Sequence, residues 1–581
     1  MARRAAWLAI FAAAVVSRLC YLDVVWVEEG YPLAAAAGML RGKMLYRDLW
    51  FDKPPLFPAF YLLAGAMPGW PLRLLGAAFV ALAAWAAARA ARAFGAGAGE
   101  QLWAAGLTAF AFVFYVHATV IALTPDLLTV PLHLAAVAAA AAGSPLLAGA
   151  LCGAAFCFNV KALFILAACA LWQWRAWPRL ALGFALPAAA VSLWLAEEGA
   201  FRDFFRQVFV WGAGYARQPL TEDPGLEFLR RTLHWAGFHA ALVVAAAWAA
   251  WRGRDARRAA WAFVSLAAVA LGMRFFPRYY FHLLPPVALL AARGFARLPR
   301  RQAALLSLLL LIPAARFGPR YLSVARGEPW ADLAMFESSR QAAAWLRAHA
   351  RPGDTLLVWG YRPELYVMSR LPAGTPFLDS QPLSGVLADR HLVSAEPAFA
   401  AWAEANRRRL LAGPQPEWIA DGLSPYNPRL DVRAFLPGWM AQYELAAELP
   451  GFRMYRRARG APQGWCGLGS SRWILPSRMV TMRCAYSAMS RSWVTSTMVL
   501  PCLWRRSNRA MISALVAESR LPVGSSASRI DGLLTSARAM ATRWRWPPLS
   551  SLGLWYTRAS RSTIRSACLA RSMRSWAGMP A

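Results

Sequence analysis

The sequence predicts an all-α polytopic membrane protein that carries a small α/β domain toward its C-terminus. Of its 581 residues, 58% are hydrophobic and only 16% are charged, a composition that soluble globular chains of this size do not show. Apolar runs of about 20 residues recur between short arginine-bearing loops, as a bilayer core about 30 Å thick requires of spanning helices. One later stretch, 341–367, instead has the pattern of an amphipathic helix, a Pro-Gly-Asp turn and a buried strand.

The first predicted helix covers about residues 5–22, with Arg3 and Arg4 on the cytoplasmic side. The run at 55–67 is short for a span and contains Pro58, so we expect an interfacial helix on the outer face. Ten further apolar runs bring the prediction to about 11 transmembrane helices: 72–93, 102–122, 127–142, 145–160, 162–174, 180–196, 232–251, 259–273, 279–296 and 302–316.

The arginines fit this topology and argue against a nucleic-acid partner. The formal net charge is +33, but the basic residues lie between apolar runs rather than on a polar face interleaved with aromatic residues. The basic turns fall on the side that the topology makes cytoplasmic. An odd number of spans makes residues 1–316 a transmembrane domain with a cytoplasmic N-terminus and residues 317–460 an extracytoplasmic α/β domain. This arrangement suits a bacterial inner membrane, with the α/β domain in the periplasm.

The segment 461–581 has a different character. It holds 17 Arg, no Lys, 21 Ser and two acidic residues, without a helical or strand period, so it lacks a plausible core. Read on the opposite DNA strand, the run 537–548 encodes a sequence that resembles the signature loop of ABC transporter ATPases. We interpret 461–581 as a spurious translation of such a gene, with a disordered basic extension as the alternative.

Five carboxylates lie in the predicted outer loop that follows the first helix. Glu28 and Glu29 are flanked by apolar sequence, where a carboxylate near lipid is costly unless it is paired or needed for function. Lys53 follows Asp52 and precedes two prolines, so it either places a cation at headgroup depth or snorkels to the interface. The five carboxylates are Asp23, Glu28, Glu29, Asp48 and Asp52.

Several motifs occur in one order along the predicted outer side. The first outer loop contains an acidic pair, then GY, GxxxY and DKPPL. Four further motifs follow along the chain: ALTPDLLTVPLHLA (122–135), FNVKALFIL (158–166), RFFPRYYFHLLPPVALLAA (274–292) and DTLLVWGYRPELYV (354–367). This order resembles the C-type membrane glycosyltransferases. That family includes the dolichyl-phosphate-mannose-protein mannosyltransferases (protein O-mannosyltransferases) and the lipid A aminoarabinose transferases. The resemblance covers about residues 5–460.

The resemblance implies transfer of a sugar from a polyprenyl-phosphate donor to an acceptor hydroxyl at the outer face. It implies a carboxylate base from the acidic pair, here Glu28 and Glu29, where the family commonly has Asp before Glu. Family members can use a divalent metal ion, although no HExxH-like spacing supports one here. Cations would stabilise the leaving phosphate. The residues expected to bind substrate are Asp52, Lys53, Asp126, Lys161, Arg274, Arg278 and His282.

The sequence leaves alternatives open for two of these residues and for the function. Asp126 follows Thr124 and Pro125, so it also fits a helix start, and His282 also fits an interface anchor. The rival function is a polytopic transporter or a lipid or glycan flippase, which would favour ionisable residues buried at mid-span and repeat-related broken helices. Neither feature is clear in the sequence.

Overall fold

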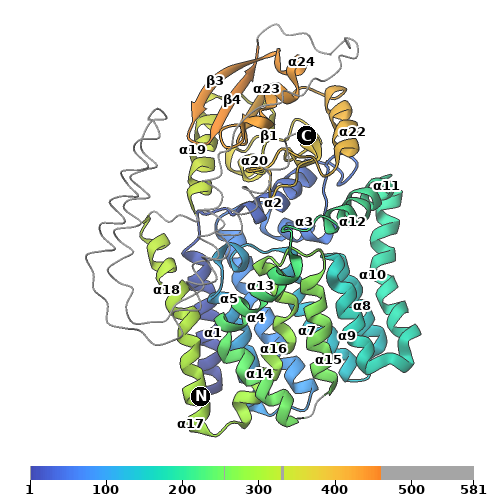
Figure 1. Cartoon of the computed structure of the whole chain (residues 1–581), viewed down its shortest axis with the longest axis vertical. Helices are drawn as coiled ribbons and strands as arrows, with labels where there is room; N and C mark the ends of the chain where they lie inside the picture. The colour runs from blue at the N-terminus through green and yellow to red at the C-terminus, as the bar shows by residue number, and fades with distance from the viewer. Residues whose placement is uncertain (1, 254–255, 329–332, 459–581) are drawn as a thin grey trace, which may run out of the picture. The chain divides into compact units, whose positions relative to one another are not determined.

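The computed structural model describes residues 2–253, 256–328 and 333–458, so the predicted tail 461–581 lies outside the described residues. Helices dominate the first part of the chain (Figure 1). In order they are α1 (Ala2–Leu19), α2 (Val27–Leu40), α3 (Leu56–Tyr61), η1 (Leu62–Ala64), α4 (Trp70–Ala93), α5 (Ala98–Val113), α6 (His117–Val120), α7 (Pro125–Ala141), α8 (Pro145–Phe156), η2 (Val160–Ala162), α9 (Leu163–Gln173), η3 (Trp174–Ala176) and α10 (Trp177–Glu197).

The helical part continues to residue 325. Its further elements are α11 (Phe201–Phe204), the π-helical turn η4 (Phe205–Val210), α12 (Trp211–Ala216), α13 (Pro224–Phe238), α14 (Ala240–Gly253), α15 (Ala256–Ala270), η5 (Pro277–His282), α16 (Leu284–Arg297), α17 (Arg300–Ser307), η6 (Leu308–Leu310) and α18 (Leu311–Ala325). Every segment predicted to span the membrane therefore contains helix.

The predicted number of about 11 spans is not confirmed. Three helical stretches within the described ranges are long and apolar enough to cross a membrane by themselves: Trp70–Ala93, Val160–Glu197 and Arg300–Ala325. A fourth candidate is the pair α13 and α14, which is bent by 96°. The predicted span 232–251 is thus divided at this bend. Glu227 pairs with Arg230 and Arg231 on α13, and a bilayer core disfavours such a charged face.

Glycines bring α8 and α10 into close contact. A Cβ atom on Gly149 would lie 2.0 Å from the carbonyl oxygen of Leu180, and one on Gly183 would lie 2.1 Å from that of Leu146. Small residues at facing positions let helix backbones approach in this way, which is the usual means of packing helices in a membrane. α8 contacts the turn η2, which follows it in the chain and carries Lys161.

The C-terminal part of the described chain is an α/β region. Its elements are α19 (Ala334–His349), β1 (Leu356–Trp359), α20 (Glu364–Ser369), α21 (Gln381–Ser384), α22 (Ala400–Leu411), β2 (Trp418–Asp421), η8 (Pro428–Leu430), α23 (Val432–Phe435), α24 (Pro437–Met440), β3 (Tyr443–Leu449) and β4 (Phe452–Arg457). The predicted helix, turn and buried strand correspond to α19, the turn with Gly353 at φ +91°, and β1.

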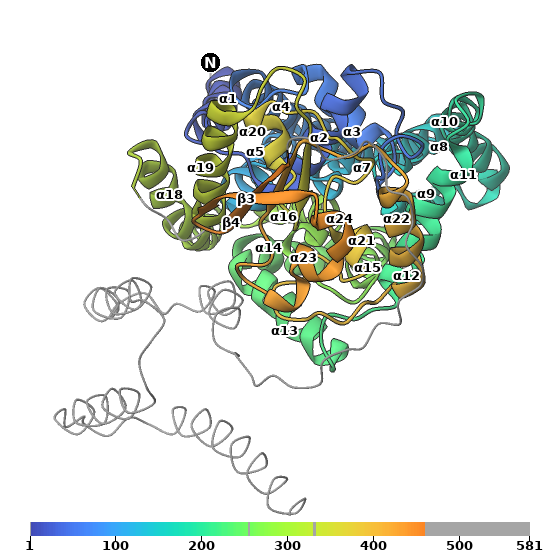
Figure 2. The same ribbon diagram turned by 90° about the horizontal axis from the view of Figure 1, so that it is seen from above.

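The four strands form one mixed sheet in the order β1-β2-β4-β3. β1 and β2 are parallel, whereas β4 runs antiparallel to both β2 and β3. All four residues of β1 and of β2 are buried, as expected for strands covered on both faces. Figure 2 shows α19 beside β3 and β4.

The α/β region is held against the helical part by direct hydrogen bonds. The backbone N–H of Trp50 donates to the carbonyl of Pro376 at 2.7 Å, and Lys43 Nζ donates to the carbonyl of Ala373 at 2.7 Å. Gly30 of α2 has no room for a Cβ, which would lie 2.8 Å from Glu364. The first loop and α2 therefore lie between the two regions, where the predicted site residues are found.

Candidate active site

Glu28 and Glu29 begin α2 but face different environments. Glu29 has a fully buried side chain that pairs bidentately with Arg73, with Oε1–Nη2 and Oε2–Nη1 distances of 2.5 and 3.1 Å. Arg73 also donates to the carbonyl of Tyr21 at 2.9 Å. A fully buried pair of this kind fixes both side chains, because removing one partner leaves an uncompensated charge. Both carboxylate oxygens of Glu29 are thus already occupied.

Glu28 remains accessible. Its side chain is 34% exposed and its Oε1 lies 2.8 Å from Arg278 Nη1. Both carboxylates lie in the first turn of α2. Glu28 is the member of the pair that a substrate can reach.

Asp126 is the centre of a buried polar cluster. It lies at the start of α7, and its Oδ1 is 3.0 Å from Asn159 Nδ2 and 3.1 Å from His282 Nε2. Arg278 Nε lies 3.7 Å from Asp126 Oδ2. Because Arg278 also contacts Glu28, one guanidinium joins both carboxylates. The structure therefore brings Glu28, Asp126, Arg278 and His282 together.

Lys161 joins the same cluster. Asn159 caps the short turn η2 by accepting from the backbone N–H of Lys161 at 3.0 Å. The Lys161 ammonium lies 4.0 Å from Asp126 Oδ1 and 3.0 Å from the centre of the Tyr279 ring. Its Nζ is buried and makes no hydrogen bond to any described residue. A buried ammonium with unused donors is suited to receive an anion.

Asp52 and Lys53 form an ion pair of 2.7 Å, with side chains 12% and 39% exposed. The loop that carries them is fixed by two hydrogen bonds, from Tyr46 Oη to the carbonyl of Lys53 and from the N–H of Phe51 to Gln207 Oε1, each 2.8 Å long. Lys161 is within electrostatic range of both Lys53 and Arg278. Three of the predicted cations thus face one small region.

Arg274 has a different place. Its guanidinium is buried, pairs with Asp389 of the α/β region and donates to the carbonyl of Gln218 at 2.8 Å. It also packs on the ring of Tyr215, 3.8 Å from the ring centre. These contacts join the α/β region to the loop after α12. The ion pair and hydrogen bonds of Arg274 are therefore made to other residues than those of Arg278, although Arg274 is within electrostatic range of Arg278 and Tyr279.

The α/β region contributes two groups that the sequence reasoning missed as site residues. Asp379 is buried, and its Oδ1 accepts from the N–H of Gln381 at 2.7 Å. Burial raises the pKa of Asp379 to about 7, and the nearby Asp52 carboxylate acts in the same direction. Tyr361 follows β1, and burial together with the carboxylates of Asp379, Asp52 and Glu28 raises its pKa. Tyr361 belongs to the motif at 354–367, whereas Asp379 lies in no motif that the sequence offers.

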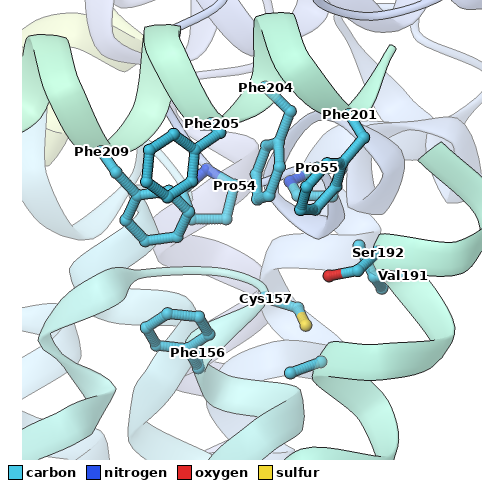
Figure 3. A pocket seen from close by; sticks show the side chains of 11 residues that line it. Pro54, Pro55, Phe156, Cys157, Val191, Ser192, Phe201, Phe204, Phe205 and Phe209 are labelled. Atoms are coloured by element: carbon cyan, nitrogen blue, oxygen red, sulfur yellow. The ribbon is translucent and has the colours of Figure 1, made fainter. Parts of the chain in front are cut away.

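An apolar pocket opens beside the DKPPL loop (Figure 3). It has a volume of about 110 Å³, and five of its eleven lining residues are phenylalanines. Phe201, Phe204, Phe205 and Phe209 come from α11 and the π-helical turn η4. The wider turn of a π-helix changes the angular spacing of side chains, and such turns often occur at functional sites. Further lining residues are Pro54, Pro55, Phe156, Cys157, Ala188, Val191 and Ser192.

A resident metal ion does not fit the donor set. Within 2–253, 256–328 and 333–458, no group of three or more His, Cys, Asp or Glu side chains is arranged to hold one. Asp126 and His282 are close together, but their other neighbours are cations and an amide. The chemistry available at the cluster is that of carboxylates, ammonium and guanidinium groups.

The fold is similar to that of ArnT, the lipid A aminoarabinose transferase. ArnT from Cupriavidus metallidurans, bound to undecaprenyl phosphate and in the apo state, matches with a TM-score of 0.53 and 17% identity over 79% of this chain and 99% of that chain. The apo oligosaccharyltransferase from Archaeoglobus fulgidus matches with a TM-score of 0.44 and 12% identity over 78% and 75% of the two chains.

No family model and no curated protein sequence matches the chain. The ArnT match nevertheless covers nearly the whole of that structure. The resemblance to C-type membrane glycosyltransferases is therefore confirmed at the level of the fold.

Proposed function

We propose that the chain is a membrane glycosyltransferase that moves a sugar from a polyprenyl-phosphate donor to an acceptor hydroxyl. The observation that supports this most strongly is the convergence of Lys53, Lys161 and Arg278 beside the accessible carboxylate Glu28. A transferase of this kind needs cations for the departing phosphate and a base for the acceptor proton. We further propose a bacterial inner membrane, with this site on the periplasmic side.

The lipid phosphate binds between the three cations. Lys161 offers unused donors, and Arg278 presents a planar fork of N–H groups that suits phosphate oxygens. Both side chains are largely shielded from water, so their attraction for the phosphate is screened less than at an open surface. Lys53 is more exposed and guides the anion to the site.

Glu28 acts as the general base. It takes the proton of the acceptor hydroxyl while the acceptor oxygen forms a bond to the anomeric carbon. The bond between that carbon and the phosphate oxygen breaks, and the electron pair leaves with the polyprenyl phosphate, which Lys161 and Arg278 stabilise. Glu29 instead holds α2 in place through Arg73. Asp126 orients Arg278 and Lys161 by pairing with both side chains.

The polyprenyl chain starts in the phenylalanine-lined pocket. Pro54 and Pro55 line this pocket and directly follow Lys53. A lipid phosphate at Lys53 therefore has an apolar surface next to it for its first isoprenyl groups. Apolar lining with a few polar groups at one end is typical of a ligand site.

The test is release of free lipid phosphate by the purified full chain in detergent, given undecaprenyl-phosphate-linked sugars and an acceptor extract. We expect release that depends on Lys161 and Glu28. Lys161→Met should weaken binding of undecaprenyl phosphate itself, whereas Glu28→Gln should preserve binding and lower turnover by about 100-fold or more. A folded wild-type protein that binds no polyprenyl phosphate would contradict the proposal.

A further inference from the structure

Two buried histidines extend the polar cluster around Asp126 into the helical part. His133 lies on α7 and His282 ends η5, and the two residues are 2% and 1% exposed. The Nδ1 atoms of both rings are buried and make no hydrogen bond to any described residue. Since buried polar groups are normally hydrogen-bonded, each of these two atoms requires a partner.

The partner of His282 Nε2 decides which nitrogen of that ring carries the proton. Asp126 lies beside Lys161 and Arg278, so its carboxylate is ionised and can only accept hydrogen bonds. His282 Nε2, which is 3.1 Å from Asp126 Oδ1, therefore carries the proton. A second proton would charge a buried ring within electrostatic range of the Lys161 ammonium. The Nδ1 atom of His282 is thus an acceptor.

Trp261 fixes the opposite tautomer in His133. The indole Nε1–H of Trp261, on α15, donates to His133 Nε2 at 2.9 Å, and the two rings meet edge to face with centroids 5.6 Å apart. An indole nitrogen can only donate, so His133 Nε2 accepts and His133 Nδ1 carries the proton. His133 therefore offers a donor at the same ring position where His282 offers an acceptor.

The fold places these two rings near each other. His133 follows Asp126 by seven residues, which is about two turns of α7, so both side chains lie on one face of the helix. His282 reaches Asp126 from η5, which contacts both α7 and α15. His133 is also within electrostatic range of His282. One water molecule between the two Nδ1 atoms would satisfy both of them.

We propose that His133 is a positioning residue for the phosphate site and acts through His282. The inference rests on the proposed function. Through one water, the Nδ1–H of His133 keeps His282 in the tautomer that carries its proton on Nε2. His282 then donates to Asp126 and holds the carboxylate in place beside Lys161 and Arg278. Without His133, the proton of His282 can move to Nδ1, and the lone pair of Nε2 would then face the carboxylate.

The first measurement is magic-angle-spinning NMR of the ring nitrogens in the ¹⁵N-histidine-labelled full chain without ligand. The chain has seven histidines, so His133→Asn and His282→Asn assign the two rings by loss of signal. We expect the proton on Nδ1 of His133 and on Nε2 of His282. His133→Leu should convert part of His282 to the other tautomer. A wild-type His282 protonated on Nδ1, or an unchanged His282 in His133→Leu, would overturn the inference.

The second measurement is the affinity of the full-length variants for undecaprenyl phosphate. An asparagine amide matches the position of the Nδ1–H of His133, whereas a glutamine amide reaches the position of Nε2. We expect His133→Leu and His133→Gln to weaken binding about fivefold to tenfold, the loss of one hydrogen bond, and His133→Asn to stay within about twofold of wild type. Equal affinities of the Asn and Gln variants would overturn the inference, because a role in packing alone does not require a donor at Nδ1.

His239→Asn is the matched control. His239 is also a buried histidine of the helical part, 4% exposed, but its Nδ1 already bonds to the carbonyl of Trp235 at 3.1 Å. The control should leave the His282 tautomer and the affinity for undecaprenyl phosphate unchanged. If His133→Leu does not fold, the wild-type spectrum and the comparison of His133→Asn with His133→Gln decide. A wild type with the expected tautomers that binds no undecaprenyl phosphate would overturn the proposed function, whereas normal binding with the wrong tautomers would overturn this inference alone.

Discussion

Two adjacent glutamates have different expected roles because their side chains are buried to different extents. Glu28 is 34% exposed beside Arg278, and Glu29 is fully buried against Arg73. We expect Glu28→Gln to lower transfer by about 100-fold or more, the usual contribution of a general base, with little change in thermal stability. Glu29→Gln should instead reduce the amount of folded protein, because it leaves Arg73 buried and unpaired. The measurements are lipid-phosphate release and thermal unfolding in detergent, and the reverse pattern would move the base to Glu29.

The raised pKa of Asp379 makes the free energy of unfolding depend on pH. Its folded pKa is raised to about 7, above the ordinary value near 4, so its contribution is most favourable below pH 4. Between pH 4 and 7 the unfolded carboxyl ionises while the folded one keeps its proton, and stability therefore falls as pH rises. The difference in Tm between wild type and Asp379→Asn should change across this range and level off above pH 7.

Asp421 provides the comparison for that measurement, because burial raises its pKa only to about 6. The Asp421→Asn difference curve should level off about one pH unit earlier. Identical difference curves for the two variants would contradict the assignment to Asp379.

At the scale of helices, the pair α8 and α10 depends on glycine. Gly183→Val would place side-chain atoms against the backbone of Leu146, where a Cβ alone already comes within 2.1 Å. We expect this change to separate the helices, lower the yield of folded protein and weaken undecaprenyl phosphate binding through Lys161. Gly106→Val in α5 is the control, since nothing lies within 4 Å of its Cβ position. Folded yield by size-exclusion chromatography distinguishes them, and equal yields would refute the packing argument.

Helix positions could be predicted from the sequence, because apolar runs and arginine turns are local signals. Their lengths could not. At the end of α5 the carbonyls of Phe112 and Val113 accept hydrogen bonds from Arg18 and Tyr321, and such contacts between distant residues leave no mark on the hydrophobic period of a single run. The bend of 96° between α13 and α14 falls inside a predicted span. The motifs placed Glu28, Asp126, Lys161 and Arg278 on one side of the chain. Only tertiary packing shows that Arg274 pairs with Asp389 and that Asp379 lies near Asp52.

For the described molecule as a whole, the contact between the α/β region and the helical part brings Asp379 close to Asp52. Arg274 is the most deeply buried ion-pair partner across this contact, held by Asp389, and Arg390 adds a bond to the carbonyl of Pro219 at 2.9 Å. We expect Arg274→Gln to loosen the α/β region, to lower kcat/KM for the sugar donor, and to leave affinity for undecaprenyl phosphate nearly unchanged, because Arg278 and Lys161 are untouched.

A double-mutant cycle with Asp389→Asn measures this coupling. If the two side chains act through each other, the double variant should lose little more than either single variant. Limited proteolysis of the loop at 385–398 gives an independent readout, since cleavage should speed up equally in all three variants. Additive losses in kcat/KM, or a loss of lipid phosphate binding in Arg274→Gln, would show that Arg274 acts on the phosphate directly rather than by positioning the α/β region.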